Sequence, residues 1–276
     1  MDCNVFRVVT ETDRALPVYV AGAGGWNHQE PMEREDGFPH FQWIQTVQGA
    51  GWFEAGGRTH NVGPGQGMLL YPHEKHRYAP VKEPWTVRWV SFDGAYVKEM
   101  LGASRLDASQ GLFLTNPELL LSRMHAILLL MDSKDPRAAL ESSALAYQFI
   151  LDLYLYASPS EVRSKEQHYE QLAPVFHYIA EHYPEPVSLQ DMAGQLGVTP
   201  QHTCLLFQQT LGMRPFAYLT LYRLRKAKEL LLQEPSLEVR TVAARVGYED
   251  SSYFIKLFKG QEGITPSRFR KIHSPR

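Results

Sequence analysis

The stretch that decides the fold is residues 188–215, SLQDMAGQLGVTPQHTCLLFQQTLGMRP, because its pattern returns at residues 238–266 as EVRTVAARVGYEDSSYFIKLFKGQEGITP. Both copies contain an alanine, a glycine four positions later, a Leu-Phe pair, a second glycine and a proline, each matched at an offset of 50 or 51 residues. In the first copy these are Ala193, Gly197, Leu206, Phe207, Gly212 and Pro215. A small residue lets two short helices approach closely, and the glycine after it allows a sharp turn. The repeat therefore predicts two helix-turn-helix units.

The ends of the predicted helices are marked by capping residues. Ser188 with Asp191 three positions later is typical of a helix start, and Thr199 caps the next helix with a proline at its first position. In the second copy we expect Ser236 and Asp250 to play the corresponding parts.

A helical wheel divides the second helix of each unit into a buried face and an exposed face. The buried faces contain Thr203, Leu206 and Phe207 in the first unit and Phe254, Leu257 and Phe258 in the second. The exposed faces contain Gln201, Cys204, Leu205 and Gln208 in the first unit and Ser252, Ile255, Lys256 and Lys259 in the second. A helix inserted in the major groove reads base edges with its exposed face, so these eight residues are the candidate DNA contacts. The other interpretation of any single exposed Gln or Lys is an ordinary solvated residue.

The charge is unevenly distributed along the 276 residues. The whole chain has a formal net charge of −2, and residues 1–167 contain 15 Lys and Arg against 20 Asp and Glu. Residues 211–276 contain 13 basic residues and 6 acidic ones. A basic C-terminal part fits a nucleic-acid partner, although a solvated basic face would look the same.

The N-terminal half favours strands and then helices, which predicts a two-domain α+β protein. Runs of β-branched and aromatic residues between Asn4 and Asp93, separated by Gly and Pro, predict a small antiparallel β-barrel or sandwich. A helix is expected from Asn116 and another from Pro136 to about Tyr156. Their apolar residues, Leu120, Ile127, Leu128, Leu145, Phe149 and Leu153, form either a dimer seam or a layer packed on the barrel. The polar stretch that follows predicts a domain boundary.

Residues 170–276 resemble the double helix-turn-helix domain of the AraC/XylS family of bacterial transcription regulators, down to the closing Gly-Ile-Thr-Pro-Ser-x-Phe-Arg-Lys at residues 263–271. The resemblance implies reading helices at residues 200–210 and 250–260, placed in successive major grooves about 34 Å apart. Leu205 stands where many members carry Arg, so the first unit is expected to make weaker or apolar base contacts. The implied domains are a sensor at 1–157, a linker at 158–169 and the DNA-binding domain at 170–276.

The N-terminal half resembles the cupin-like sensor domain of the same family. Cupin enzymes hold a metal with three histidines and a glutamate. His76 matches one of these histidines, but Gln42, Asp36 and Phe38 stand where the other ligands belong. A single matched histidine does not supply a metal site, so we expect no metal and no cofactor.

Polar and aromatic side chains remain at the predicted barrel mouth and suit a sugar or a related polar effector. They are His40, Gln42, Trp43, His76, Tyr78 and Trp89. Strand alternation places Gln42 and Trp43 on opposite faces, and both choices of the inward face stay open. Each of these residues also fits a core position.

Together these observations predict a DNA-binding transcription regulator, and not an enzyme, that is modulated by a small-molecule effector. We expect a cytoplasmic protein, because the start of the chain lacks a signal peptide and the two cysteines form no disulfide or metal pattern. The apolar residues of the two predicted helices suggest that it is a homodimer. Double-stranded DNA and RNA polymerase are the expected macromolecular partners. The alternative is a cupin-type metalloenzyme with an accessory helical binding domain, and a third hypothesis is a DNA-binding protein whose barrel only mediates assembly.

Overall fold

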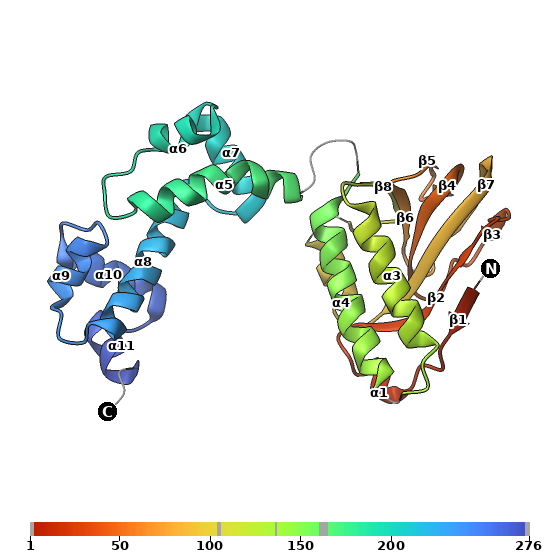
Figure 1. The fold of residues 1–276 in the computed structure, drawn as a ribbon, viewed down its shortest axis with the longest axis horizontal. Coiled ribbons are helices and arrows are strands. Elements are labelled where there is room, and N and C mark those ends of the chain that lie inside the picture. The colour runs from red at the N-terminus through yellow and green to blue at the C-terminus, as the bar shows by residue number, and fades with distance from the viewer. Residues whose placement is uncertain (1–2, 104–105, 136, 160–164, 274–276) are drawn as a thin grey trace. The chain divides into compact units, whose positions relative to one another are not determined.

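A computed structural model describes residues 3–103, 106–135, 137–159 and 165–273 (Figure 1). The chain divides into two compact units, Met1–Glu166 and Gln167–Arg276, the first a sheet with helices and the second entirely helical. The predicted α+β fold class is confirmed. No helix in the described part of the chain is both long enough and apolar enough to cross a lipid bilayer.

The first unit contains a nine-stranded antiparallel sheet. Its strands are β1 (Cys3–Phe6), β2 (Tyr19–Trp26), β3 (Met32–Arg34), β4 (Phe41–Ala55), β5 (Arg58–Val62), β6 (Gln66–Leu70), β7 (His76–Asp93), β8 (Gln110–Leu114) and β9 (Ala157–Ser158). The main path runs β1-β2-β7-β4-β6-β8-β9, with β3 on β7 and β5 on β4. The long strands β4 and β7 pair from Phe41 with Phe92 to Ala55 with His76, and the register shifts near Gln48. Gly51 lies just after these shifts, where any Cβ would collide with the Trp85 ring, so only glycine lets the two strands pack there.

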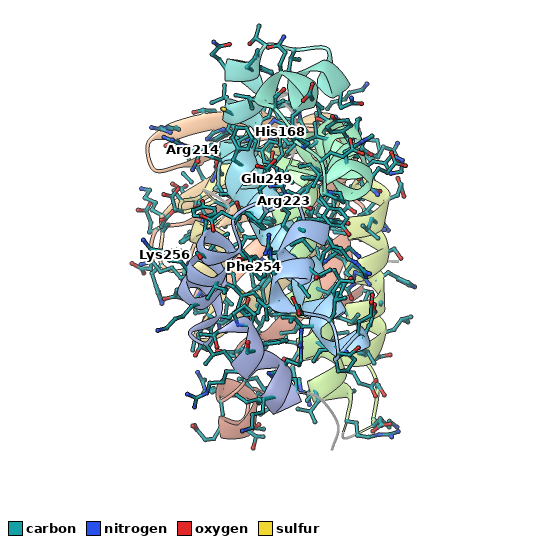
Figure 2. All side chains as sticks on the ribbon, turned by 90° about the vertical axis from the view of Figure 1, so that its left-hand side faces the viewer. His168, Arg214, Arg223, Glu249, Phe254 and Lys256 are labelled. Carbon is teal, nitrogen blue, oxygen red and sulfur yellow. The ribbon has the colours of Figure 1, made fainter. Side chains whose placement is uncertain are left out.

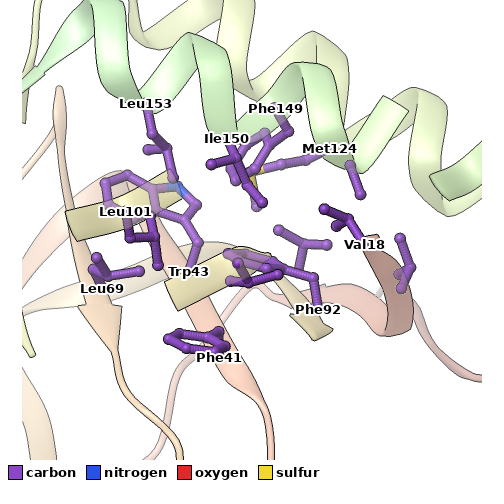
Figure 3. Packing of buried hydrophobic residues seen from close by; sticks show 14 of the residues in the cluster. Val18, Phe41, Trp43, Leu69, Phe92, Leu101, Met124, Phe149, Ile150 and Leu153 are labelled. Atoms are coloured by element: carbon purple, nitrogen blue, oxygen red, sulfur yellow. The ribbon is translucent and has the colours of Figure 1, made fainter. Parts of the chain in front are cut away.

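The two faces of the sheet bury different side chains. One face carries Ile44, Phe53 and Trp89 in a core inside the curve of the sheet. The other face carries Trp43 and packs under helices α3 (Pro117–Met131) and α4 (Ala138–Tyr156), as Figure 3 shows. Strand alternation therefore places Gln42 with Ile44 on the inner face and Trp43 towards the helices.

Helices α3 and α4 bury most of their apolar residues against the sheet of the same domain. Leu120, Ile127, Phe149 and Leu153 are fully buried in the helix-facing core, and Leu128 and Leu145 pack against it. The predicted start at Asn116 is confirmed, because its side chain accepts a hydrogen bond from the backbone N–H of Leu119 at 3.3 Å. Pro136, the expected start of the second helix, lies outside the described residues. The short helices α1 (Glu11–Arg14) and α2 (Val97–Gly102) complete this unit.

The second unit is built around two hydrophobic cores that share one long helix. Its helices are α5 (Lys165–His182), α6 (Leu189–Leu196), α7 (Pro200–Leu211), α8 (Pro215–Gln233), α9 (Val239–Arg245), α10 (Ser251–Glu262) and α11 (Pro266–His273). The first core gathers side chains of α5 to α8, including Phe207 and Leu219. The second gathers side chains of α8 to α11, including Leu224, Ala227 and Phe254. The two helix-turn-helix units are thus α6-α7 and α9-α10.

The capping predictions are confirmed at three of four helix starts. Ser188 and Asp191 form a complete capping box on α6, Thr199 caps α7, and Asp250 accepts from Ser252 N at 2.7 Å on α10. The prediction for Ser236 is wrong. The N-cap of α9 is Glu238, which makes no side-chain capping bond, so this helix begins two residues later than expected.

The capping box of α6 predicts a pH-dependent contribution to stability. The Ser188 hydroxyl donates to the Asp191 carboxylate at 2.6 Å and the Ser188 backbone N–H at 2.8 Å, which lowers the pKa of Asp191 below 3.8. The ionised form is therefore favoured in the folded state, and its contribution is full above pH 3.8 and disappears as pH falls through the lowered pKa. We expect Asp191→Asn to lower the free energy of unfolding at neutral pH and to match the wild type in acid. Urea unfolding at stepped pH measures this, and a difference that stays constant with pH would contradict it.

Candidate nucleic-acid interface and ligand pocket

Helix α7 presents most of its predicted reading residues to solvent. Gln201, Leu205 and Gln208 are exposed, and Cys204 is half-buried. The opposite face is buried as predicted, with Thr203, Leu206 and Phe207 at 0, 3 and 0% exposure. The helix is therefore fixed to its unit by one face and leaves the other available.

Helix α10 repeats this arrangement with a more basic exposed face. Ser252, Lys256 and Lys259 are exposed, and Ile255 is half-buried and packs against the second core. Phe254 and Phe258 are fully buried, and Leu257 is half-buried against the same core. Within the described residues, Lys256 and Lys259 have no ion-pair partner, so their charges can interact with a polyanion.

The structure adds three exposed residues near these faces that the sequence reasoning did not single out. They are His202 on α7, Arg214 at the start of α8 and Tyr253 on α10, whose side chain is 55% exposed. In Figure 2, Arg214 and Lys256 lie towards the same side of the helical unit. No sequence pattern indicates that Tyr253 is exposed, because an aromatic residue beside Phe254 is expected in the core.

A small pocket of about 90 Å³ lies at one end of the inner face of the sheet. It is lined by Phe6, Trp26, Gln29, Met32, Arg34, Phe38, Gln42, Ile44, Tyr78 and Trp89. Three of the six predicted effector residues, Gln42, Tyr78 and Trp89, meet here. The structure adds Arg34, which comes from the short strand β3.

The polar groups of this pocket are already oriented. Arg34 Nη1 donates to Gln42 Oε1 at 3.3 Å, and the Arg34 guanidinium lies 4.6 Å from the Phe38 ring centroid. Trp89 Nε1 donates to Asn4 Oδ1 at 2.8 Å, and the Trp89 ring centroid lies 5.3 Å from that of Phe6. Burial raises the pKa of the Tyr78 hydroxyl, which is therefore a neutral donor. The pocket combines several aromatic rings with a charged donor, an amide and a hydroxyl.

The other three predicted effector residues lie outside the lining of this pocket. Trp43 is fully buried in the core beneath α3 and α4. His40 Nδ1 lies 3.1 Å from Asp93 Oδ2 near the end of the sheet. His76 is buried beside the Tyr78 ring and borders a separate hollow of about 350 Å³.

His76 has the chemistry of a core histidine in this structure. Its Nδ1 lies 2.8 Å from the backbone carbonyl oxygen of Glu74, which can only accept, so Nδ1 carries the proton. Burial lowers the pKa of His76 and favours the neutral ring. Among the described residues, no group of three or more His, Cys, Asp and Glu side chains is arranged to hold a metal ion.

Comparison with known proteins agrees with both parts of this description. A family model described as an AraC-like ligand binding domain matches residues 16–150, and one described as a helix-turn-helix domain matches residues 192–272. The chain is 25% identical over 228 residues to the lactose operon transcription activator of Staphylococcus xylosus, covering 82% of this chain and 81% of that protein. It is 29% identical over 245 residues to the arabinose operon regulatory protein of Escherichia coli (strain K12), covering 82% and 78%.

Among solved structures, the chain is similar to the C-terminal domain of AraT, a response regulator from Geobacillus stearothermophilus. The identity is 32% and the TM-score 0.35, covering 38% of this chain and 90% of that chain. The two family models match the two structural units in order, and relatives that are operon regulators match over most of their own length. The chain therefore belongs to the AraC family of DNA-binding transcription regulators, with an AraC-like ligand binding domain followed by a helix-turn-helix domain.

Proposed function

We propose that this regulator responds to a sugar or a closely related polyol that binds in the pocket formed by Arg34, Gln42, Tyr78 and Trp89. The observation that carries the proposal is the combination of aromatic rings and oriented hydrogen-bonding groups in one pocket. Sugar C–H faces pack on aromatic rings, and sugar hydroxyls need fixed donors and acceptors. The relatives named for the lactose and arabinose operons support the same ligand class.

The pocket must widen to take such a ligand. Its volume of about 90 Å³ is well below the roughly 300 Å³ at which ligand pockets usually begin. Phe6 is 67% exposed and belongs to β1, which pairs with the sheet through only four residues. We infer that ligand entry displaces the Phe6 ring from Trp89 and with it the end of β1.

For the DNA, we propose that α7 contributes Gln201, Cys204, Leu205 and Gln208 and that α10 contributes Ser252, Ile255, Lys256 and Lys259. Within this set Cys204 and Ile255 are half-buried, so their contacts are apolar and limited to their exposed edges. The proposed domains remain 1–157 and 170–276 with a linker at 158–169. The described helix α5 begins at Lys165, and residues 160–164 lie outside the description.

We also propose that the chain acts as a homodimer through the outer face of α3 and α4. Leu129, Leu140, Tyr147 and Leu151 are 61, 55, 47 and 41% exposed on this pair of helices. Exposed apolar side chains grouped in this way favour a protein partner, and a second copy would double the number of DNA-reading helices.

The ligand proposal predicts a specific effect of Trp89. We expect Trp89→Leu to weaken sugar binding about 3- to 10-fold, since ring contacts of this kind are worth roughly 0.5–1.5 kcal/mol. Titration calorimetry with L-arabinose, lactose and raffinose measures the affinity. Trp52→Leu is the matched control, because Trp52 alternates with the inward-facing Phe53 on β4.

The proposed function is tested by measuring DNA affinity of the full chain with and without each sugar. The DNA probe is a duplex enriched by the wild-type protein from a random-sequence pool. A sugar that binds the pocket and changes the DNA affinity supports the proposal. Binding of a sugar that leaves the DNA affinity unchanged rejects the switch, and binding that Trp89→Leu does not weaken rejects the pocket.

A further inference from the structure

Arg223 occupies the middle of α8, at the point where this helix passes from one helix-turn-helix unit to the other. Leu219, one turn before it, belongs to the first core, and Leu224 and Ala227 after it belong to the second. The Arg223 side chain therefore stands at the joint between the two units.

On one side, Arg223 holds the loop that connects α5 to α6. Its Nε donates to the Tyr183 carbonyl oxygen at 2.7 Å and its Nη2 to the Glu185 carbonyl oxygen at 2.8 Å. Both bonds involve a charged donor, and the planar guanidinium gives them a fixed direction. The loop directly precedes α6 and so belongs to the first helix-turn-helix unit.

On the other side, Arg223 contacts the turn between α9 and α10. Its Cζ lies 5.3 Å from the Tyr248 ring centroid. Gly247 in this turn has φ 87°, and a Cβ there would lie 2.9 Å from Arg223 Nη2 and 2.8 Å from the Pro184 carbonyl oxygen. The loop before the first helix-turn-helix unit and the turn within the second helix-turn-helix unit thus both contact the Arg223 guanidinium.

The contact continues to the second reading helix. The Tyr248 ring centroid lies 5.6 Å from that of Phe254, which is buried beneath α10. Figure 2 labels Arg223 and Phe254, the two ends of this series of contacts, and Lys256 on the same helix as Phe254. A shift of the turn relative to Arg223 would therefore change the position of the helix that carries Lys256.

Direct packing between the two helix-turn-helix units, α6-α7 and α9-α10, is interrupted beside Arg223. A groove of about 490 Å³ lies here, lined by Pro184, Phe216, Arg223, Gly247, Tyr248 and Tyr253 among others. The Tyr183 ring packs against both cores, next to the carbonyl that Arg223 binds. The angle between the two helix-turn-helix units therefore depends on α8 and on the contacts of Arg223 and Tyr183.

We propose that Arg223 is the positioning residue that fixes α10 relative to α7 and thereby sets the spacing of DNA half-sites that the chain accepts. The inference rests on the proposed reading roles of α7 and α10. Inserting one base pair moves a half-site by about 3.4 Å and rotates it by about 35°. A rigid pair of readers cannot follow this change, whereas a pair freed from Arg223 can.

The first test measures affinity as a function of spacing with the full chain. The duplexes are the enriched two-half-site sequence, versions with one or two base pairs inserted between the halves, and a version with one half replaced. We expect the wild type to lose about 10-fold or more per inserted base pair, comparable to a mismatched base pair. We expect Arg223→Ala to bind the original duplex more weakly, to vary by less than about 3-fold across spacings, and to bind the half-replaced duplex like the wild type.

Two further variants separate positioning from general support of the fold. Arg225→Ala removes the same charge two residues along α8, where the guanidinium faces Tyr222 and Glu229 within the helix, and should keep the wild-type spacing dependence. Arg223→Lys keeps the charge but not the two-pronged donor, and should be intermediate. If Arg223→Ala does not fold, Arg223→Lys decides the question. An unchanged spacing profile, or an equal loss on every duplex including the half-replaced one, overturns the proposal.

The second test needs no DNA and so distinguishes a failure of this inference from a failure of the proposed function. Spin labels at Gln208→Cys and Lys259→Cys, in a chain with Cys3→Ser and Cys204→Ser, report the distance between the two reading helices. We expect Arg223→Ala, or Arg223→Lys if the alanine variant does not fold, to broaden this distance distribution. An unchanged distance distribution overturns the positioning role of Arg223, even if the chain binds DNA. A wild-type chain that enriches no sequence from the random pool instead rejects the proposed DNA-reading roles of α7 and α10.

Discussion

Replacing Phe254 with alanine is expected to lower the free energy of unfolding of the helical unit by about 3–5 kcal/mol and to abolish specific DNA binding. Phe254 is fully buried, and its ring centroid lies 5.8 Å from that of Phe258 and 5.6 Å from that of Tyr248. Removing the ring leaves a cavity in the core that the long helix α8 shares with the shorter helices α9, α10 and α11. Since a domain has only about 5–15 kcal/mol of stability in total, a large part of it would be lost.

The measurement is chemical unfolding followed by circular dichroism, with DNA affinity measured in parallel. Gln261→Ala is the matched control, because Gln261 lies on the same helix but is exposed, and its effect should stay within about 0.5 kcal/mol. A Phe254→Ala protein that unfolds at the wild-type denaturant concentration would show that this core does not support α10.

The second large effect is expected at Lys256. We expect Lys256→Ala to cost about 1–3 kcal/mol in binding to the enriched duplex and to relax the base preference at one position. The side chain is exposed on α10 and has no ion-pair partner among the described residues, so it can donate to guanine O6 and N7 in the major groove.

Selection from random DNA with both proteins measures the change in preference position by position. Lys98→Ala removes an exposed lysine from α2 in the ligand binding domain and should leave the selected sequence unchanged. If Lys256→Ala weakens binding equally to all sequences, Lys256 contacts a phosphate and not a base.

The helical unit could be predicted from sequence because its signals are local and occur twice. Capping residues, glycines at helix ends and the Leu-Phe pair all act within one or two turns of the residues that carry them. Ser236 shows where this reasoning failed. The 50-residue offset maps Ser188 onto Glu238, but the capping preference of serine suggested a start two residues earlier, and the structure follows the repeat.

The ligand pocket could be predicted only in part, because its residues come together through strand pairing. Gln42, Tyr78 and Trp89 were identified from residue type, but the choice between the two faces of β4 needed the helices that cover Trp43. Arg34 and Phe6 gave no local signal. They reach the pocket because β3 pairs with β7 and β1 pairs with β2.

Helix α8 supplies buried side chains to both cores, and this has a consequence for proteolysis. A cut between α8 and α9, near the exposed residues Pro235, Ser236 and Glu238, would separate Leu224, Ala227 and Leu231 from the part of the chain whose helices cover them. The N-terminal fragment, once separated, would expose the apolar face of α8. It would aggregate before it could compete with the intact regulator for DNA. Cleavage at this position would therefore abolish DNA binding without producing a stable fragment that competes for the same DNA sites.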